Sequence, residues 1–102
     1  MSFERWGFQF EGAFSSPDNL KSVPGVYVIW CKEGDNWKVL DVGEADDVKG
    51  RVSNHDRSEC WKRNCFGTIY YSATYTAGLT EEQRRQIEQR IRELTDPPCG
   101  KI

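Results

Sequence analysis

Two short segments with the composition of buried β-strands lie on either side of a turn, and this arrangement constrains the fold most. The first, Gly25 to Cys31, is rich in β-branched and aromatic residues and follows a Pro-Gly break. The second runs from Trp37 to Val42. The residues between them, Lys32 to Asn36, include Gly34, which can adopt positive φ. The pattern therefore predicts an antiparallel β-hairpin.

The segments that follow indicate further helices and a third strand. Over residues 46–55, two valines and His55 recur at the spacing of one helical stripe, which predicts a helix. The helix is expected to continue or restart over 58–63, where Trp61 would anchor it to the core. Residues 68–76 alternate in polarity and have high β-propensity, so they predict a strand.

The C-terminal part of the chain predicts a helix, and the N-terminal part predicts a strand and a helical turn. Thr80 to Gln83 has the spacing of a capping box, which predicts a last helix running to about Thr95. The expected apolar stripe of this helix consists of Ile87, Ile91 and Leu94. Near the N-terminus, Phe8 and Phe10 alternate as in a strand, and residues 17–20 indicate a turn of helix.

Length and charge limit the class of protein. The 102 residues predict one domain spanning 1–102, and the net charge of −2 excludes nucleic-acid binding through bulk positive charge. No run of about 18 apolar residues is present, and residues 1–14 mix charges with aromatics, unlike a signal peptide. A cytoplasmic protein without a membrane partner is expected.

The charges are unevenly distributed. Residues 32–47 hold two lysines and six carboxylates, a balance of −4, whereas residues 49–63 hold five Lys and Arg and two carboxylates, a balance of +3. The second segment is either a solvated helical face or a local phosphate-binding surface.

The four cysteines, Cys31, Cys60, Cys65 and Cys99, have no C-x-x-C spacing. Without a secretory signal they are expected to be reduced, buried thiols. A zinc site formed by His55 with Cys60, Cys65 and Cys99 is the alternative, although the four-residue gap between Cys60 and Cys65 is marginal for such a site.

Five short elements along the chain together resemble the GIY-YIG nuclease superfamily. They are Gly25-Val26-Tyr27 as the first motif, Asp41-Val42-Gly43 as the second motif with its tyrosine replaced, Arg51, His55, and Glu88 on the last helix. The similarity covers about residues 22–100, and the ordered set is far more specific than any single motif.

The resemblance implies an α+β domain with a small, three-stranded, mainly antiparallel sheet flanked by helices, which hydrolyses phosphodiester bonds in DNA. Glu88 would bind Mg²⁺ or Mn²⁺, and Arg51 would hold the scissile phosphate through its planar donors. Tyr27 would act as the base or as a hydroxyl that orients water. His55, one helical turn after Arg51, could donate or accept a proton.

Each of these residues also has an ordinary structural explanation. Tyr27 could be a buried core tyrosine, Arg51 could pair with Asp47, and Glu88 could pair with Arg84 or Arg92.

The replacement of the second-motif tyrosine leaves two outcomes open. A hairpin turn centred on Gly34 would place Asp41 opposite Tyr27. There the carboxylate could share the metal with Glu88, or it could repel phosphate and attach to Arg51, leaving a site that binds without cutting.

Two non-enzymatic functions therefore stay open beside the nuclease. A module of the same fold could bind nucleic acid or protein through the basic segment and through exposed aromatic residues. The residues concerned are Lys49, Arg57, Lys62 and Arg63, with Trp61, Tyr70 or Tyr71 for stacking on bases. Alternatively, the acidic segment 32–47 could dock a basic protein. No DNA-binding segment accompanies the domain in this sequence, so a protein partner could supply target specificity.

Overall fold

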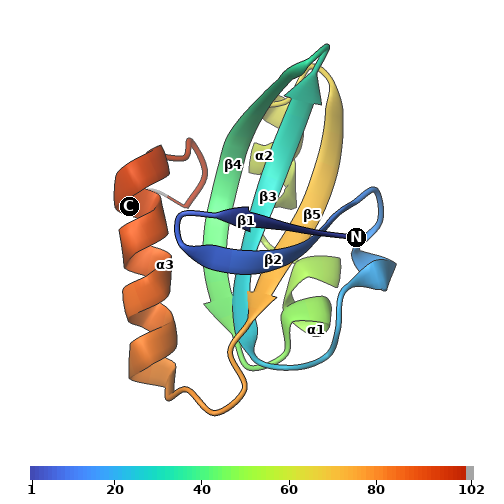
Figure 1. The fold of residues 1–102 in the computed structure, drawn as a ribbon. Coiled ribbons are helices and arrows are strands. Elements are labelled where there is room, and N and C mark those ends of the chain that lie inside the picture. The colour runs from blue at the N-terminus through green and yellow to red at the C-terminus, as the bar shows by residue number, and fades with distance from the viewer. Residues whose placement is uncertain (101–102) are drawn as a thin grey trace.

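The computed structural model describes residues 1–100 and contains one five-stranded sheet with helices on both of its faces (Figure 1). The elements in chain order are β1 (Ser2–Arg5), β2 (Phe8–Phe14), η1 (Pro17–Asn19), β3 (Gly25–Glu33), β4 (Asn36–Ala45), α1 (Val48–Ser53), α2 (Ser58–Arg63), β5 (Thr68–Tyr75) and α3 (Glu81–Thr95). The strand order is β1-β2-β5-β3-β4, and all the strand pairs are antiparallel. The prediction of a three-stranded sheet was wrong, because the N-terminal residues add two strands.

The two additional strands form a hairpin that extends the sheet beyond β5. Arg5 pairs with Phe8 across a turn in which Trp6 and Gly7 both have positive φ, 53° and 85°. Two such residues form the tight turn that matches the twist of antiparallel strands. Strand β2 then pairs with β5, and the hairpin crosses in front of β3 and β5 (Figure 1). In the sequence, the feature that could have indicated this hairpin is Gly7, because a turn of this kind requires positive φ.

The hairpin of β3 and β4 forms as predicted, but its register differs by two residues. The turn contains two residues, so Glu33 pairs with Asn36, and β4 has one extra residue, Leu40, between two successive pairs. As a result Tyr27 lies opposite Gly43, and Asp41 lies opposite Ile29. The predicted pairing of Tyr27 with Asp41 was therefore wrong.

Side chains of β3 alternate between two separate cores, one on each face of the sheet. Tyr27, Ile29 and Cys31 belong to the core under α1 and α2, which lie behind the sheet in Figure 1. Val26, Val28 and Trp30 belong to the core beneath the β1–β2 hairpin and α3. Helix α3 packs along β4, where Ile91 is fully buried and Leu94 is 58% exposed, so the predicted apolar stripe does not include Leu94.

The cysteines form two disulfides, Cys31–Cys65 and Cys60–Cys99, which corrects the expectation of reduced thiols. The paired residues are 34 and 39 positions apart in sequence, and the fold brings their Cα atoms to 5.5 and 5.9 Å, within the range that disulfides require. Because Cys60, Cys65 and Cys99 are all bonded to other sulfurs, the zinc alternative is also excluded.

Within residues 1–100, no helix has the length and apolar character needed to cross a bilayer.

Candidate active site

The Tyr27 hydroxyl contacts the imidazole of His55, and this contact joins two of the predicted site residues. The Tyr27 oxygen lies 2.6 Å from His55 Nε2, and the two rings meet edge to face with centroids 5.6 Å apart. Strand β3 carries Tyr27, and His55 follows the short helix α1 directly. Both residues are buried, with 1% and 7% of their surfaces exposed. The contact therefore lies beneath the surface of the protein.

The backbone beside His55 determines which ring nitrogen carries the proton. The backbone N–H of Arg57 donates to His55 Nδ1 at 3.0 Å. Burial and the nearby charge of Arg57 lower the pKa of His55, so the ring is neutral at pH 7. With Nδ1 as the acceptor, Nε2 carries the proton and donates to the Tyr27 oxygen. The Asp56 carboxylate, 3.2 Å from Nδ1, would accept a bond from this nitrogen only if the ring were protonated.

The ionisation of Tyr27 reflects the other predicted site residues. The pKa of Tyr27 is raised to about 12, mainly by burial; the carboxylates of Asp41 and Glu88 act in the same direction, and the charges of Arg57 and Arg51 oppose them. Burial, Arg57 and Asp41 are the larger causes of this shift, and Arg51 and Glu88 lie near enough to Tyr27 for their charges to act on its hydroxyl. At neutral pH Tyr27 keeps its proton, which favours a water-orienting hydroxyl over a base.

Gly43, the glycine of the second motif, makes room for the tyrosine of the first. It pairs with Tyr27 across the β3–β4 ladder. A Cβ atom at this position would overlap the ring and the hydroxyl of Tyr27. The two motifs therefore form one packing unit, in which a side chain at position 43 would displace the tyrosine.

Asp41, which replaces the tyrosine of the second motif, is fully buried and accepts hydrogen bonds from two arginines. Arg57 Nε donates to its carboxylate at 2.7 Å, and Arg92 Nη2 donates at 2.6 Å. The indole N–H of Trp61 and the Val42 backbone N–H complete the set, at 2.8 and 2.9 Å. Within residues 1–100 the hydrogen-bond partners of Asp41 are therefore Arg57, Arg92, Trp61 and Val42, so the expected attachment of Asp41 to Arg51 is not found.

Arg92 was missed by the sequence argument as a partner of Asp41. Besides Asp41, its guanidinium donates to the backbone carbonyls of Val42 and, at 3.1 Å, of Cys99. This side chain therefore holds β4, α3 and the segment after α3 together. From the sequence, Arg92 was expected only as a candidate ion-pair partner of Glu88, one helical turn away.

Arg51 is exposed and has no ion-pair partner within the described residues. Asp47, the alternative partner suggested by sequence, instead caps α1 by accepting a bond from the Gly50 backbone N–H at 3.0 Å. The Arg51 guanidinium is therefore free to bind an anion such as a phosphate.

Glu88 is half-buried on α3, and among residues 1–100 its only ion pair is long. Arg92 Nε lies 3.8 Å from its carboxylate, whereas Arg84 pairs with Glu44 at 2.9 Å. Burial raises the pKa of Glu88; the carboxylates of Glu44 and Asp41 also raise it, while Arg92 and Arg57 lower it.

Glu88 would offer a single carboxylate to a cation. The only cluster of three potential ligands among residues 1–100 is Cys31, Glu33 and Cys65, whose sulfurs are bonded to each other. A metal at Glu88 would therefore keep most of its ligands as water or phosphate oxygens, an arrangement that suits Mg²⁺.

The predicted nucleic-acid-binding residues differ in their exposure. Lys62 and Arg63 are exposed and Lys49 is half-buried, whereas Arg57 points inward to Asp41. Trp61 is only 3% exposed, so the expectation that it is available for stacking was wrong. Tyr71 packs against Trp61, and Tyr70 belongs to the opposite face of the sheet.

No family model, no curated protein and no solved structure matches this chain.

Proposed function

We propose that this chain is a metal-dependent phosphodiesterase of GIY-YIG type that cleaves DNA. One observation supports it most: the charges of Arg51 and Glu88 act on the tyrosine hydroxyl that contacts His55, although the four residues come from β3, α1, the loop after α1, and α3. This arrangement combines an anion-binding guanidinium, a carboxylate for a cation and a protonated hydroxyl, the groups that phosphodiester hydrolysis needs.

Each residue has a distinct role in this proposal. Arg51 binds the scissile phosphate, because its guanidinium is exposed and unpaired within the described chain. Glu88 holds Mg²⁺ or Mn²⁺, which when bound supplies positive charge to the phosphate and an activated water. The Tyr27 hydroxyl orients the attacking water, and the His55 N–H fixes the direction of that hydroxyl.

Arg57 and Arg92 are positioning residues in the same proposal. Their charges compensate Asp41, so the replaced tyrosine does not add net negative charge where phosphate must bind.

A second function is favoured by the burial of Tyr27. Only 1% of this residue is exposed, so a substrate would reach its hydroxyl only after the surrounding side chains move. A domain that keeps this closed form would bind nucleic acid or a protein partner without cleaving the strand.

Supercoiled plasmid incubated with Mg²⁺ or Mn²⁺ distinguishes the two functions. We expect nicking that EDTA abolishes and that Glu88→Gln and Arg51→Ala each reduce by about 100-fold or more, the scale of losing one electrostatic contact in a transition state. Glu93→Gln and Arg90→Ala, exposed residues of α3, are matched controls and should cleave normally. Cleavage that persists in both site variants would reject the proposal. Salt-sensitive binding without strand breaks would establish the second function.

A further inference from the structure

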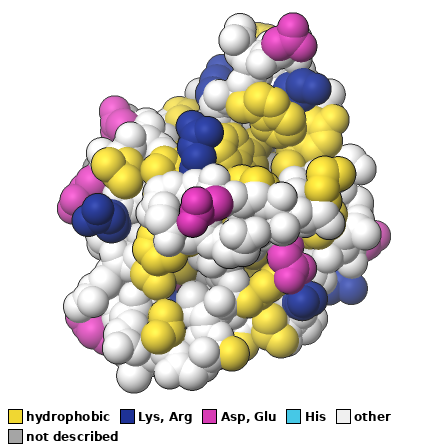
Figure 2. Space-filling view, in the orientation of Figure 1, with side chains coloured by type: hydrophobic (Ala, Val, Ile, Leu, Met, Phe, Trp, Pro, Cys, Tyr) yellow, Lys and Arg dark blue, Asp and Glu magenta, His cyan; other side chains and the backbone are white. Residues whose placement is uncertain are grey.

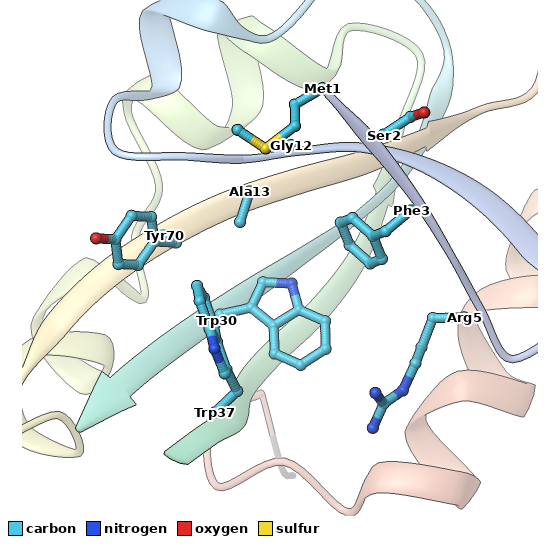
Figure 3. Close-up of a pocket in the computed structure, with 9 residues that line it drawn as sticks. All are labelled: Met1, Ser2, Phe3, Arg5, Gly12, Ala13, Trp30, Trp37 and Tyr70. Atoms are coloured by element: carbon cyan, nitrogen blue, oxygen red, sulfur yellow. The ribbon is translucent and has the colours of Figure 1, made fainter. Parts of the chain in front are cut away.

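Aromatic side chains line an open cleft on the face of the sheet opposite Tyr27. The cleft has a volume of about 440 Å³, and Phe3, Trp30, Trp37 and Tyr70 form most of its walls (Figure 3). Figure 2 shows hydrophobic side chains gathered above the β1–β2 hairpin, with Lys and Arg side chains at their border. None of the lining residues is a carboxylate.

The rings in the cleft are tilted against one another. Trp30 and Trp37 meet at 87° with centroids 6.1 Å apart, and Trp37 and Tyr70 meet at 52° and 5.1 Å. Trp37 is 44% exposed, although it sits among other aromatic residues. Trp30 is stacked on Trp6, and Phe3 is stacked on Phe10, so the ring surface available to a flat ligand is mainly that of Trp37.

Two cations border the cleft without anionic partners. The Arg5 guanidinium lies 6.0 Å from the centroid of Trp30, and Lys32 Nζ lies 5.4 Å from that of Trp37. Neither has an ion pair in the part of the chain that the structure describes. The cleft is therefore complementary to a ligand that joins a flat ring to a negative charge.

We propose that this cleft binds an unpaired nucleotide of a single-stranded segment, with the base against Trp37 and Tyr70 and the phosphates near Arg5 and Lys32. A base in a duplex is covered on both faces by its neighbours, whereas an unpaired base can stack on a protein ring. The choice of a nucleic acid as the ligand rests on the proposed nuclease function. Because the cleft and Tyr27 lie on opposite faces of the sheet, the cleft would hold a strand without contacting the scissile phosphate.

The test is binding of a fluorescein-labelled oligothymidylate of about ten nucleotides, a length within the range of single-strand sites. Fluorescence anisotropy is measured in EDTA, so that no cleavage is required. Two further probes are an abasic oligomer of the same length and a duplex.

We expect the oligothymidylate to bind about tenfold more tightly than the abasic oligomer or the duplex. Trp37→Ala should weaken its binding by about tenfold, and Trp37→Phe, which keeps a ring, by less. Arg5→Ala should reduce the affinity for all three probes. Phe66→Ala removes a 91% exposed aromatic residue that does not line the cleft and should leave binding unchanged.

Three results would overturn the proposal: equal affinity for the abasic oligomer, Trp37→Ala binding like the unmodified protein, or no binding at all. Circular dichroism of the Trp37 variants establishes that they are folded. If base-dependent binding is found while plasmid is not cleaved, only the proposed function fails. If plasmid is cleaved while Trp37→Ala binds normally, only the cleft proposal fails.

Discussion

Strand β3 contributes side chains to both faces of the sheet, and the surroundings of these side chains differ between the two faces. On one face Tyr27 lies in a closed, polar environment in which a buried carboxylate is held by two arginines and two disulfides join distant segments. On the other face Trp30 forms part of an open aromatic cleft bordered by unpaired cations. We call the side of the sheet that carries Tyr27 and Asp41 the polar face, and the side that carries Trp30 and Trp37 the aromatic face. The comparison indicates that the stability of the polar face depends on specific hydrogen-bond partners, whereas the aromatic face offers exposed ring surface for binding. The indole N–H signals of Trp61 and Trp37 in NMR spectra report on each face separately.

Removing the Asp41 carboxylate should have the largest effect. Asp41→Ala leaves two guanidiniums and an indole N–H without their common acceptor, so the free energy of unfolding should fall by about 3–5 kcal/mol. Urea unfolding measures the loss, and the Trp61 signal should shift while that of Trp37 stays. Asp46→Ala, at an exposed carboxylate nearby, is the control. A loss below about 1 kcal/mol would show that the polar face tolerates a missing partner.

Opening the disulfides should have the next largest effect. We expect Cys31→Ala/Cys65→Ala and Cys60→Ala/Cys99→Ala each to lower the free energy of unfolding by about 2–4 kcal/mol. The two losses should be similar, because the linked residues are 34 and 39 positions apart and the entropy of loop closure changes slowly with length. Urea unfolding with and without a reductant measures both. Unequal losses of unfolding free energy would show that one disulfide stabilises the protein mainly through contacts in the folded state and not through loop-closure entropy.

A methyl group at position 43 should disturb the polar face alone. Gly43→Ala forces the Tyr27 ring to move, with an expected loss of about 1–3 kcal/mol in the free energy of unfolding. Gln86→Ala, at an exposed position of α3, is the control. Thermal unfolding and the two indole signals measure the result. A shift of the Trp37 signal would contradict the separation of the two faces.

The smallest effect concerns pH and His55. The pKa of His55 in the folded protein lies below its usual 6.5, so the unfolded chain binds more protons between these two values. The free energy of unfolding should therefore fall as pH decreases from 7 through this window. His55→Gln should remove this part of the slope while keeping the contributions of all carboxylates, including Glu88. Parallel urea curves at pH 7 and 5.5 measure the difference, and identical slopes would show that His55 is not buried in its neutral form.

The local elements were predictable from sequence where periodicity and turn chemistry agree. The Thr80–Gln83 capping box forms, and the polar alternation of β5 matches its two faces. The β1–β2 hairpin was missed because the charged and exposed residues of β1 have no strand-like alternation. Its position in the sheet depends on pairing with β5, a contact between distant segments that local patterns do not encode.

The site was predictable only as a set of residues. Motif spacing selected Tyr27, Arg51, His55 and Glu88; the Tyr27 hydroxyl contacts His55, and the charges of Arg51 and Glu88 act on it. The surroundings of Asp41 could not be predicted, because they depend on the extra residue in β4 and on side chains from α2 and α3. The disulfides were missed because pairing depends on tertiary proximity, and the choice of reduced thiols rested on an expected compartment.

The extra residue in β4 also affects how the sheet ends. Strand β4 is an edge strand, and such edges are templates for intermolecular β-pairing and aggregation. Leu40 interrupts the regular ladder there, and its carbonyl accepts a hydrogen bond from the Cys99 backbone N–H at 3.0 Å. The segment after α3 thus covers one point of this edge, at the Leu40 carbonyl. This irregularity in β4 therefore turns one backbone carbonyl of the edge strand inward to the protein's own C-terminal segment.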